Sequence, residues 1–197
     1  MIRISIVIPT PVGNPYDFEQ SGNYFLLSKC LNSLVRNKSD RFEYEFLVIG
    51  NAWTGFEANV NRGFRMATGD YIWLINDDIE IEKGVDERMV DAFTEGVGLV
   101  SATDYANTEW EEQGLPSYWN VMFSRACLET VGHLDGNYET FSSDHDHALR
   151  VSKAGFKIVH TGVVGVKHAR SQTVKRLKDE QGLKERAREK FLAKWKL

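Results

Sequence analysis

The first part of the chain alternates between apolar runs and segments in which apolar side chains recur every three or four positions. Residues 2–8 form a continuous β-branched run, and residues 43–50 and 71–76 are also rich in apolar side chains, as in strands of a buried sheet. Residues 24–37 and 57–68 have the spacing of amphipathic helices. The pattern predicts β-α-β-α-β with short connections, which indicates an α/β layer with a mostly parallel sheet.

The second half of the chain continues this layer with shorter elements. Further strands are predicted at 97–102 and 119–124 and within 156–168, and further helices at 84–96, at 125–132 and from Asp144 to about Lys153. The predicted fold class is therefore α/β, with a mostly parallel central sheet flanked by helices. Such sheets bind ligands outside the carboxyl ends of their strands.

Charge and composition narrow the function classes. The chain has 197 residues, which fits one domain, and a formal net charge of −4. Residues 173–197 hold nine Lys or Arg and four Asp or Glu, so the preceding residues carry −9. An acidic body argues against nucleic-acid binding.

The sequence also predicts the cellular location of the protein. No run of about 18 apolar residues indicates a membrane-spanning helix, and a strand that begins at Ile2 leaves no room for a signal segment. Two cysteines, Cys30 and Cys127, predict neither a disulfide scaffold nor a zinc site. We therefore expect a cytoplasmic protein.

Polar residues close the predicted strands, with Thr10, Asn51 and the sequence Asn76-Asp77-Asp78 at their carboxyl ends. Two adjacent carboxylates at the end of a buried strand lose hydration, which costs free energy. Because Asp is common in turns, a simple turn is one interpretation. A divalent cation explains the cluster better, since hard cations prefer oxygen ligands and compensate the charges. The cluster predicts that the protein handles a metal or a phosphate.

A second acidic cluster, Asp144 and Asp146, lies where a helix is predicted to begin. Both residues have a structural interpretation as capping residues favoured by the helix dipole, worth about 1 kcal/mol each. This interpretation suits Asp146. Asp144, at the junction of loop and helix, is also a candidate general base, which needs a free carboxylate in a cleft. His168 closes an apolar strand and is a candidate metal ligand, whereas the other histidines are most simply structural or exposed.

Several common catalytic and nucleotide-binding motifs are missing from the sequence. There is no GxGxxG after the first strand, no GxxxxGK[ST] phosphate loop and no GxSxG nucleophile elbow. Dinucleotide-binding Rossmann enzymes, P-loop proteins and α/β-hydrolases are therefore disfavoured.

Segments spread over almost the whole chain resemble, in order, those of one family. These segments are 2–10 with 26–34, 55–78, 121–138, 144–159, and 163–173 with 191–195. In this order they resemble the family 2 glycosyltransferases, which are inverting enzymes of the GT-A fold. The resemblance implies a GT-A domain over 1–172, with a nucleotide-sugar-binding half at 1–78 and an acceptor half at 97–172. Residues 173–197 would be a basic helical tail.

The resemblance also implies a role for each candidate site residue. Asp144 matches the catalytic base. Asp78, His168 and Asn76 match a site for Mn²⁺ or Mg²⁺ that bridges the diphosphate of a nucleotide-sugar donor. Residues expected to bind that donor are Pro9, Thr10, Asn51, Asn59, Arg62 and Asp77. Trp119 and His145 are expected to bind the acceptor, a hydroxyl on a saccharide, a lipid-linked molecule or a protein.

The chain departs from the family at the end of the second strand. Members usually carry an acidic residue where this chain has Gly50 and Asn51. The sequence therefore does not indicate which nucleobase the donor carries. A catalytically silent nucleotide-sugar-binding module is an alternative, although the presence of Asp78, Asp144 and His168 argues against it. A sugar nucleotidyltransferase is a second alternative, but residues 9–17 contain no Arg or Lys to hold phosphates.

The basic tail carries Leu183, Ala187, Phe191 and Trp195 at four-residue steps. One interpretation is an amphipathic helix on an anionic membrane, where a lipid-linked acceptor would be located. The other is a terminal helix that packs its apolar stripe on the domain. We favour the second, because Gly182 interrupts the helix and the stripe is narrow.

Overall fold

The computed structural model describes residues 1–11, 21–50, 55–103, 114–138, 141–169 and 179–197. Its strands are β1 (Ile2–Thr10), β2 (Phe42–Gly50), β3 (Tyr71–Ile75), β4 (Ile79–Ile81), β5 (Val97–Ser101), β6 (Asn120–Ser124), β7 (Lys157–His160) and β8 (Val166–His168). Its helices are α1 (Ser21–Asn37), α2 (Phe56–Met66), α3 (Val85–Asp91), α5 (Arg125–Val131), α6 (Ser143–Lys153) and α7 (Glu180–Trp195).

The described strands form a six-stranded central sheet in the order β2-β1-β3-β6-β5-β7 and a separate pair, β4-β8. β1 pairs in parallel with β2 and β3, and β5 pairs in parallel with β7. Only β6 runs against its neighbours β3 and β5. The prediction of a mostly parallel sheet flanked by helices is confirmed.

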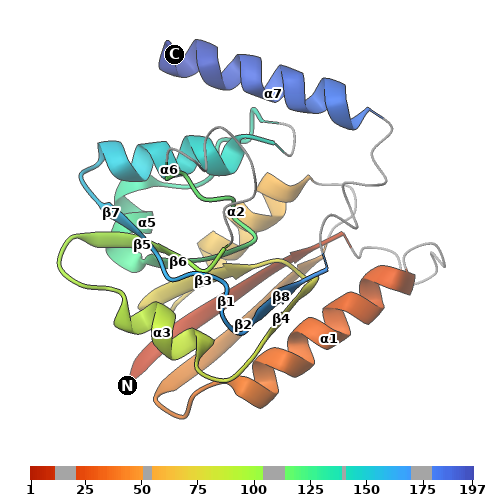
Figure 1. Ribbon diagram of the computed structural model, residues 1–197, viewed down its shortest axis with the longest axis vertical. Helices are drawn as coiled ribbons and strands as arrows, with labels where there is room; N and C mark the ends of the chain where they lie inside the picture. The colour runs from red at the N-terminus through yellow and green to blue at the C-terminus, as the bar shows by residue number, and fades with distance from the viewer. Residues whose placement is uncertain (12–20, 51–54, 104–113, 139–140, 170–178) are drawn as a thin grey trace.

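Helices cover both faces of the sheet (Figure 1). In β1, Ile4, Ile6 and Ile8 join the core beneath α1 and α3, whereas Val7 joins the core beneath α2, α5, α6 and α7. Successive strand side chains point to opposite faces, so one apolar run supplies both cores. The buried run at the start of the sequence is explained by this central position.

Two glycines let chain segments approach β1 closely. A Cβ on Gly63 would lie 2.2 Å from Cγ1 of Val7, so only glycine lets α2 pack against β1 at this distance. A Cβ on Gly69 would lie 2.6 Å from the backbone nitrogen of Ser5. These contacts fix the position of β3, which follows directly and carries the strand-end carboxylates.

The predicted elements differ from the structure at a few boundaries. The helix predicted at 84–96 ends at Asp91, whereas the segment 156–168 contains strands as predicted, namely β7 and β8. The short strand β4 was not predicted. Its pairing with β8 matters for the site, because it brings two distant parts of the chain together.

Candidate active site

The carboxyl ends of β1 and β3 meet at the strand-end cluster, which we define as Thr10, Asn76, Asp77 and Asp78. The hydroxyl of Thr10 donates a hydrogen bond of 2.7 Å to Oδ2 of Asp77. Burial raises the pKa of Asp77 to about 6, and the charge of Asp78 adds to this effect while the bond from Thr10 opposes it. The neighbouring charges therefore repel each other in a partly desolvated setting.

The β4-β8 pair places His168 beside Asp78. Ile79 of β4 is the register partner of His168, and the backbone N–H of Ala169 donates to the carbonyl of Asp78 at 3.0 Å. The imidazole Nε2 of His168 lies 3.3 Å from Oδ1 of Asp78, and their side chains are 16% and 8% exposed. The sequence predicted both residues, and the structure brings them together.

Two oxygens of the strand-end cluster have no hydrogen-bond donor. Oδ1 of Asn76 and Oδ1 of Asp78 are both buried without a hydrogen-bond partner, a costly state for polar atoms. Among the described residues, no three His, Cys, Asp or Glu side chains converge on one point. Carboxylate, amide and imidazole donors nevertheless suit Mn²⁺ or Mg²⁺, which often take only one or two protein carboxylates and fill their remaining positions with phosphate and water.

Tyr118 and Trp119 connect the strand-end cluster with Asp144. The ring of Trp119 stacks on that of His168, with centroids 4.6 Å apart and planes at 27°. The backbone carbonyl of Trp119 accepts a hydrogen bond from the N–H of Asn76 at 2.9 Å. The N–H of the adjacent Tyr118 donates to Oδ2 of Asp144 at 3.4 Å. Two consecutive residues thus contact both halves of the predicted site.

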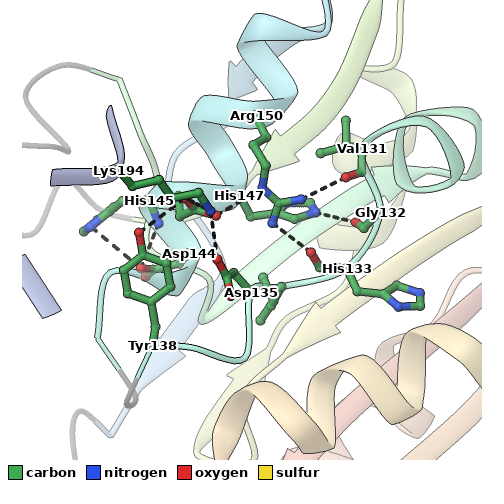
Figure 2. A network of polar contacts seen from close by, with 12 residues as sticks. Val131, Gly132, His133, Asp135, Tyr138, Asp144, His145, His147, Arg150 and Lys194 are labelled. Atoms are coloured by element: carbon green, nitrogen blue, oxygen red, sulfur yellow. Dashed lines mark hydrogen bonds and ion pairs between the residues drawn. The ribbon is translucent and has the colours of Figure 1, made fainter. Parts of the chain in front are cut away.

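Asp144 lies in the first turn of α6 and is partly exposed, with 21% of its side chain accessible. Its Oδ1 accepts a hydrogen bond of 2.9 Å from the N–H of His145. The ring of His145 is buried, and neither of its nitrogens has a hydrogen-bond partner, although Nδ1 lies 3.7 Å from Oδ1 of Asp144. Figure 2 shows the two side chains at the start of this helix. A partly exposed carboxylate and an unpartnered imidazole suit contact with a ligand.

Asp146 differs from the capping residue that the sequence indicated. Its side chain is fully buried and accepts hydrogen bonds from Arg150, Tyr138 and Trp195 instead of from the free amides at the helix start. The capping interpretation was therefore wrong for Asp146. Local sequence could not reveal this, because Trp195 lies 49 positions away.

His147, the next residue, is buried in its neutral form. Burial lowers its pKa to about 4. Its Nδ1 lies 2.9 Å from the hydroxyl of Tyr118, and its Nε2 lies 2.8 Å from the carbonyl of Gly132. The neutral tautomer with the proton on Nε2 satisfies both contacts, so His147 is structural, as predicted.

The remaining predicted donor residues are only partly located. Pro9 is buried near the end of β1, Asn59 is buried on α2, and Arg62 is exposed on α2. Asn51 lies outside the described residues. Their roles stay predictions.

Comparison with known proteins identifies the family. The family model described as glycosyl transferase family 2 matches residues 34–150, more than half of the chain. The chain belongs to glycosyl transferase family 2. The matched range contains the strand-end carboxylates and Asp144. No curated protein matches the chain with significance.

Solved structures share the fold of this family 2 chain at low sequence identity. A mannosyltransferase from Pyrobaculum calidifontis, in complex with GDP-mannose and Mn²⁺, aligns with a TM-score of 0.65 and 13% identity over 87% of this chain and 58% of its own. The catalytic domain of a Drosophila β1,4-galactosyltransferase 7, in complex with xylobiose, aligns with a TM-score of 0.59 and 13% identity over 87% of this chain and 72% of its own. Staphylococcus aureus TarS aligns with a TM-score of 0.58 and 11% identity over 81% of this chain and 58% of its own.

The family assignment confirms the predicted glycosyltransferase, and the fold confirms the predicted GT-A architecture. Within the described ranges, the family 2 chain has no helix that is both long enough and apolar enough to span a bilayer. The cytoplasmic location stays a prediction.

Sequence reasoning missed three residues that organise this region. Asn61 of α2 exchanges two hydrogen bonds of 2.9 Å with the backbone of Leu134. Tyr118 contacts Asp144 and His147, and Lys194 of α7 contacts Asp146. The only signal in the sequence was that Asn61 lies inside the family-like segment 55–78 and that Tyr118 lies just before the one that begins at residue 121. No local pattern marked Lys194.

Proposed function

We propose that this family 2 protein is a metal-dependent, inverting glycosyltransferase that moves a sugar from a nucleoside-diphosphate sugar to a hydroxyl acceptor. The single observation that carries the proposal is the bridge made by Tyr118 and Trp119. Through it the candidate base, Asp144, and the candidate metal ligand, His168, belong to one site. Neither cluster alone would indicate group transfer.

The metal-binding part of the proposal rests on the unpartnered oxygens. Asp78 and His168 would hold Mn²⁺ or Mg²⁺, with Asn76 as a further oxygen donor, because Oδ1 of both Asn76 and Asp78 is buried without a hydrogen bond. When bound, the cation would offset negative charge on the departing diphosphate. The stacked ring of Trp119 limits the orientations that His168 can adopt.

The donor would lie across the carboxyl ends of β1 and β3. Asp77, which accepts a hydrogen bond from the hydroxyl of Thr10, would accept hydrogen bonds from the ribose or the sugar. The other proposed donor contacts are Pro9, Asn51, Asn59 and Arg62. Related folds have been solved with GDP-mannose and with UDP-galactose, each together with manganese, which supports a nucleoside-diphosphate sugar as the class of donor.

Asp144 would act as the base. As the acceptor oxygen attacks the anomeric carbon, its proton passes to the carboxylate of Asp144. The new bond joins the acceptor oxygen to the anomeric carbon, and the bond between that carbon and the phosphate oxygen breaks. The nucleoside diphosphate leaves from the opposite face, so the configuration inverts.

The acceptor would approach beside His145. Its two ring nitrogens are buried without hydrogen-bond partners next to the base, so an acceptor hydroxyl would satisfy one of them. Trp119, also expected to bind the acceptor, is 8% exposed and packs on His168. A saccharide, a lipid-linked molecule or a protein hydroxyl all fit this proposal.

The test is calorimetric titration with UDP, GDP, dTDP and CDP, each with and without Mn²⁺. We expect one nucleotide to bind tightly only with the metal, which would also identify the nucleotide class of the donor. The variant Asp144→Asn should keep this affinity and lose transfer by about 10²–10⁴-fold. Nucleotide affinity that does not depend on Mn²⁺ would contradict the proposed metal site. Wild-type transfer activity in Asp144→Asn would contradict the assignment of Asp144 as the base.

A further inference from the structure

The C-terminal helix α7 packs against α6, the helix that carries Asp144 (Figure 1). Phe191 is fully buried and Ala187 is 2% exposed, in the same core cluster as Ala148 and Val151 of α6. Nζ of Lys153, at the end of α6, lies 5.1 Å from the ring centroid of Trp195. The apolar stripe of the tail therefore packs on the domain. The family match ends at residue 150, so α7 lies beyond it.

Two residues of α7 also contact the buried carboxylate of Asp146. Nζ of Lys194 lies 2.8 Å from Oδ1 of Asp146, and the indole N–H of Trp195 donates to the same oxygen at 3.0 Å. The hydroxyl of Tyr138 donates to it at 3.4 Å, and Nε of Arg150 donates to Oδ2 at 3.1 Å. Asp146 is fully buried, and a buried carboxylate persists only when charges and donors compensate it. Here α7 supplies the only ammonium among these contacts.

Lys194 connects three segments at this point. It also pairs with Oδ2 of Asp135 at 2.8 Å, in the loop that follows α5. Figure 2 shows its side chain reaching into the network around Asp135, Tyr138 and the start of α6. With 37% of its side chain exposed, Lys194 is not part of the apolar core. A change at this position therefore tests the ionic contact without opening a cavity.

The first turn of α6 depends on contacts outside the helix. Its N-cap residue, Ser142, has a left-handed backbone with φ of 65° and makes no side-chain cap. A non-glycine residue in this conformation costs about 1 kcal/mol, and a missing cap costs about as much again. Such a conformation persists only where the surroundings impose it. Asp146, in the same turn as Asp144, contacts Tyr138 outside the helix and Lys194 and Trp195 of α7.

We propose that α7 orients the catalytic base, with Lys194 and Trp195 as positioning residues that act on Asp144 through Asp146. The inference rests on the proposed role of Asp144 and extends it to the C-terminal helix. Small displacements of a reacting group reduce rates strongly, so loosening this turn slows transfer without weakening donor binding.

The test compares Lys194→Met and Trp195→Phe with the control Lys196→Met, which removes a charge from an exposed position two residues later. Hydrogen exchange followed by mass spectrometry reports on peptides covering residues 141–153 and residues 2–10. We expect about tenfold faster exchange at the start of α6 in the two test variants, with unchanged exchange in β1 and in the control. Affinity for the nucleotide identified by titration with Mn²⁺ should stay within about twofold, while kcat falls about 10- to 100-fold. Lys194→Arg should recover most of kcat.

The outcomes separate this inference from the proposed function. Unchanged exchange at residues 141–153 in both test variants would overturn the inference, as would faster exchange there with unchanged kcat. Equal acceleration in β1 would mean general destabilisation and would also count against it. If the wild-type protein neither binds a nucleotide nor transfers sugar, the proposed function fails, and the exchange data still decide whether α7 holds this turn.

Discussion

The side chains of Asp78 and Asp146 are 8% and 0% exposed, but their surroundings are opposite. Among the described residues, Oδ1 of Asp78 has no hydrogen-bond partner, and Nε2 of His168 lies 3.3 Å from it. Asp146 receives donors from Arg150, Tyr138 and Trp195, and Lys194 pairs with it. Burial alone therefore does not distinguish a binding group from a structural one.

The difference lies in whether the protein itself satisfies the charge. In the strand-end cluster, Oδ1 of Asp78 and Oδ1 of Asn76 lack donors and a second carboxylate, Asp77, lies next in sequence, so a cation would satisfy what the fold leaves open. At the contact between α6 and α7, Arg150 and Lys194 neutralise the carboxylate of Asp146, and these contacts hold α6 in place. Neighbouring Asp144 is intermediate, because two backbone N–H groups bind it and part of it faces solvent.

The largest expected effect on stability is that of Asp146→Asn. It leaves Arg150 and Lys194 facing a neutral amide, and breaking a buried ion pair typically costs about 3–5 kcal/mol. Asp144→Asn is the matched control, with an expected change below about 0.5 kcal/mol, because no ionic partner from the described part of the chain lies closer than 3.7 Å to its carboxylate. Urea unfolding at pH 7 measures both. Equal losses in the two variants would abolish the distinction drawn between these carboxylates.

A smaller effect is expected from pH at His147. Its pKa is lowered from 6.5 to about 4 on folding, so the unfolded chain binds the proton more readily between these values. Its stabilising contribution is complete above pH 6.5 and is lost as pH falls toward 4, by about 2 kcal/mol between pH 7 and pH 5. Urea unfolding at both pH values should show a smaller drop for His147→Gln than for the wild type.

The control for this prediction is His133→Gln, since His133 is exposed on its loop and its pKa is lowered less by burial. If the free energy of unfolding depends on pH identically in His147→Gln and the wild type, His147 has the same pKa in the folded and the unfolded state. Its tautomer and its contact with Tyr118 would then need to be reassigned.

Sequence patterns predicted the part of the site that is local. Apolar runs located β1 and β3, and the polar residues after them located Asp77 and Asp78. The three-residue strand β4 is too short for periodicity to detect, and a strand predicted within 156–168 does not reveal its pairing partner, so the contact of Asp78 with His168 came only from family resemblance until the structure showed it.

The environment of Asp146 could not be predicted in the same way. Its partners lie on α7 and in the loop after α5, and spacing within a helix says nothing about contacts between helices. The stacking of Trp119 on His168 is missing from the sequence prediction for the same reason.

The smallest expected effect on stability is that of a substitution at Asp78, the other carboxylate compared above. Because its Oδ1 has no donor and Asp77 lies next to it, Asp78→Asn should leave the metal-free protein equally stable or stabilise it by up to about 1 kcal/mol. The same change should abolish Mn²⁺-dependent nucleotide binding. Urea unfolding in EDTA, with Glu82→Gln as an exposed acidic control, measures the first part, and titration measures the second. A clear loss of stability in EDTA would mean that the fold satisfies Asp78 without a cation, so that Asp78 is structural like Asp146.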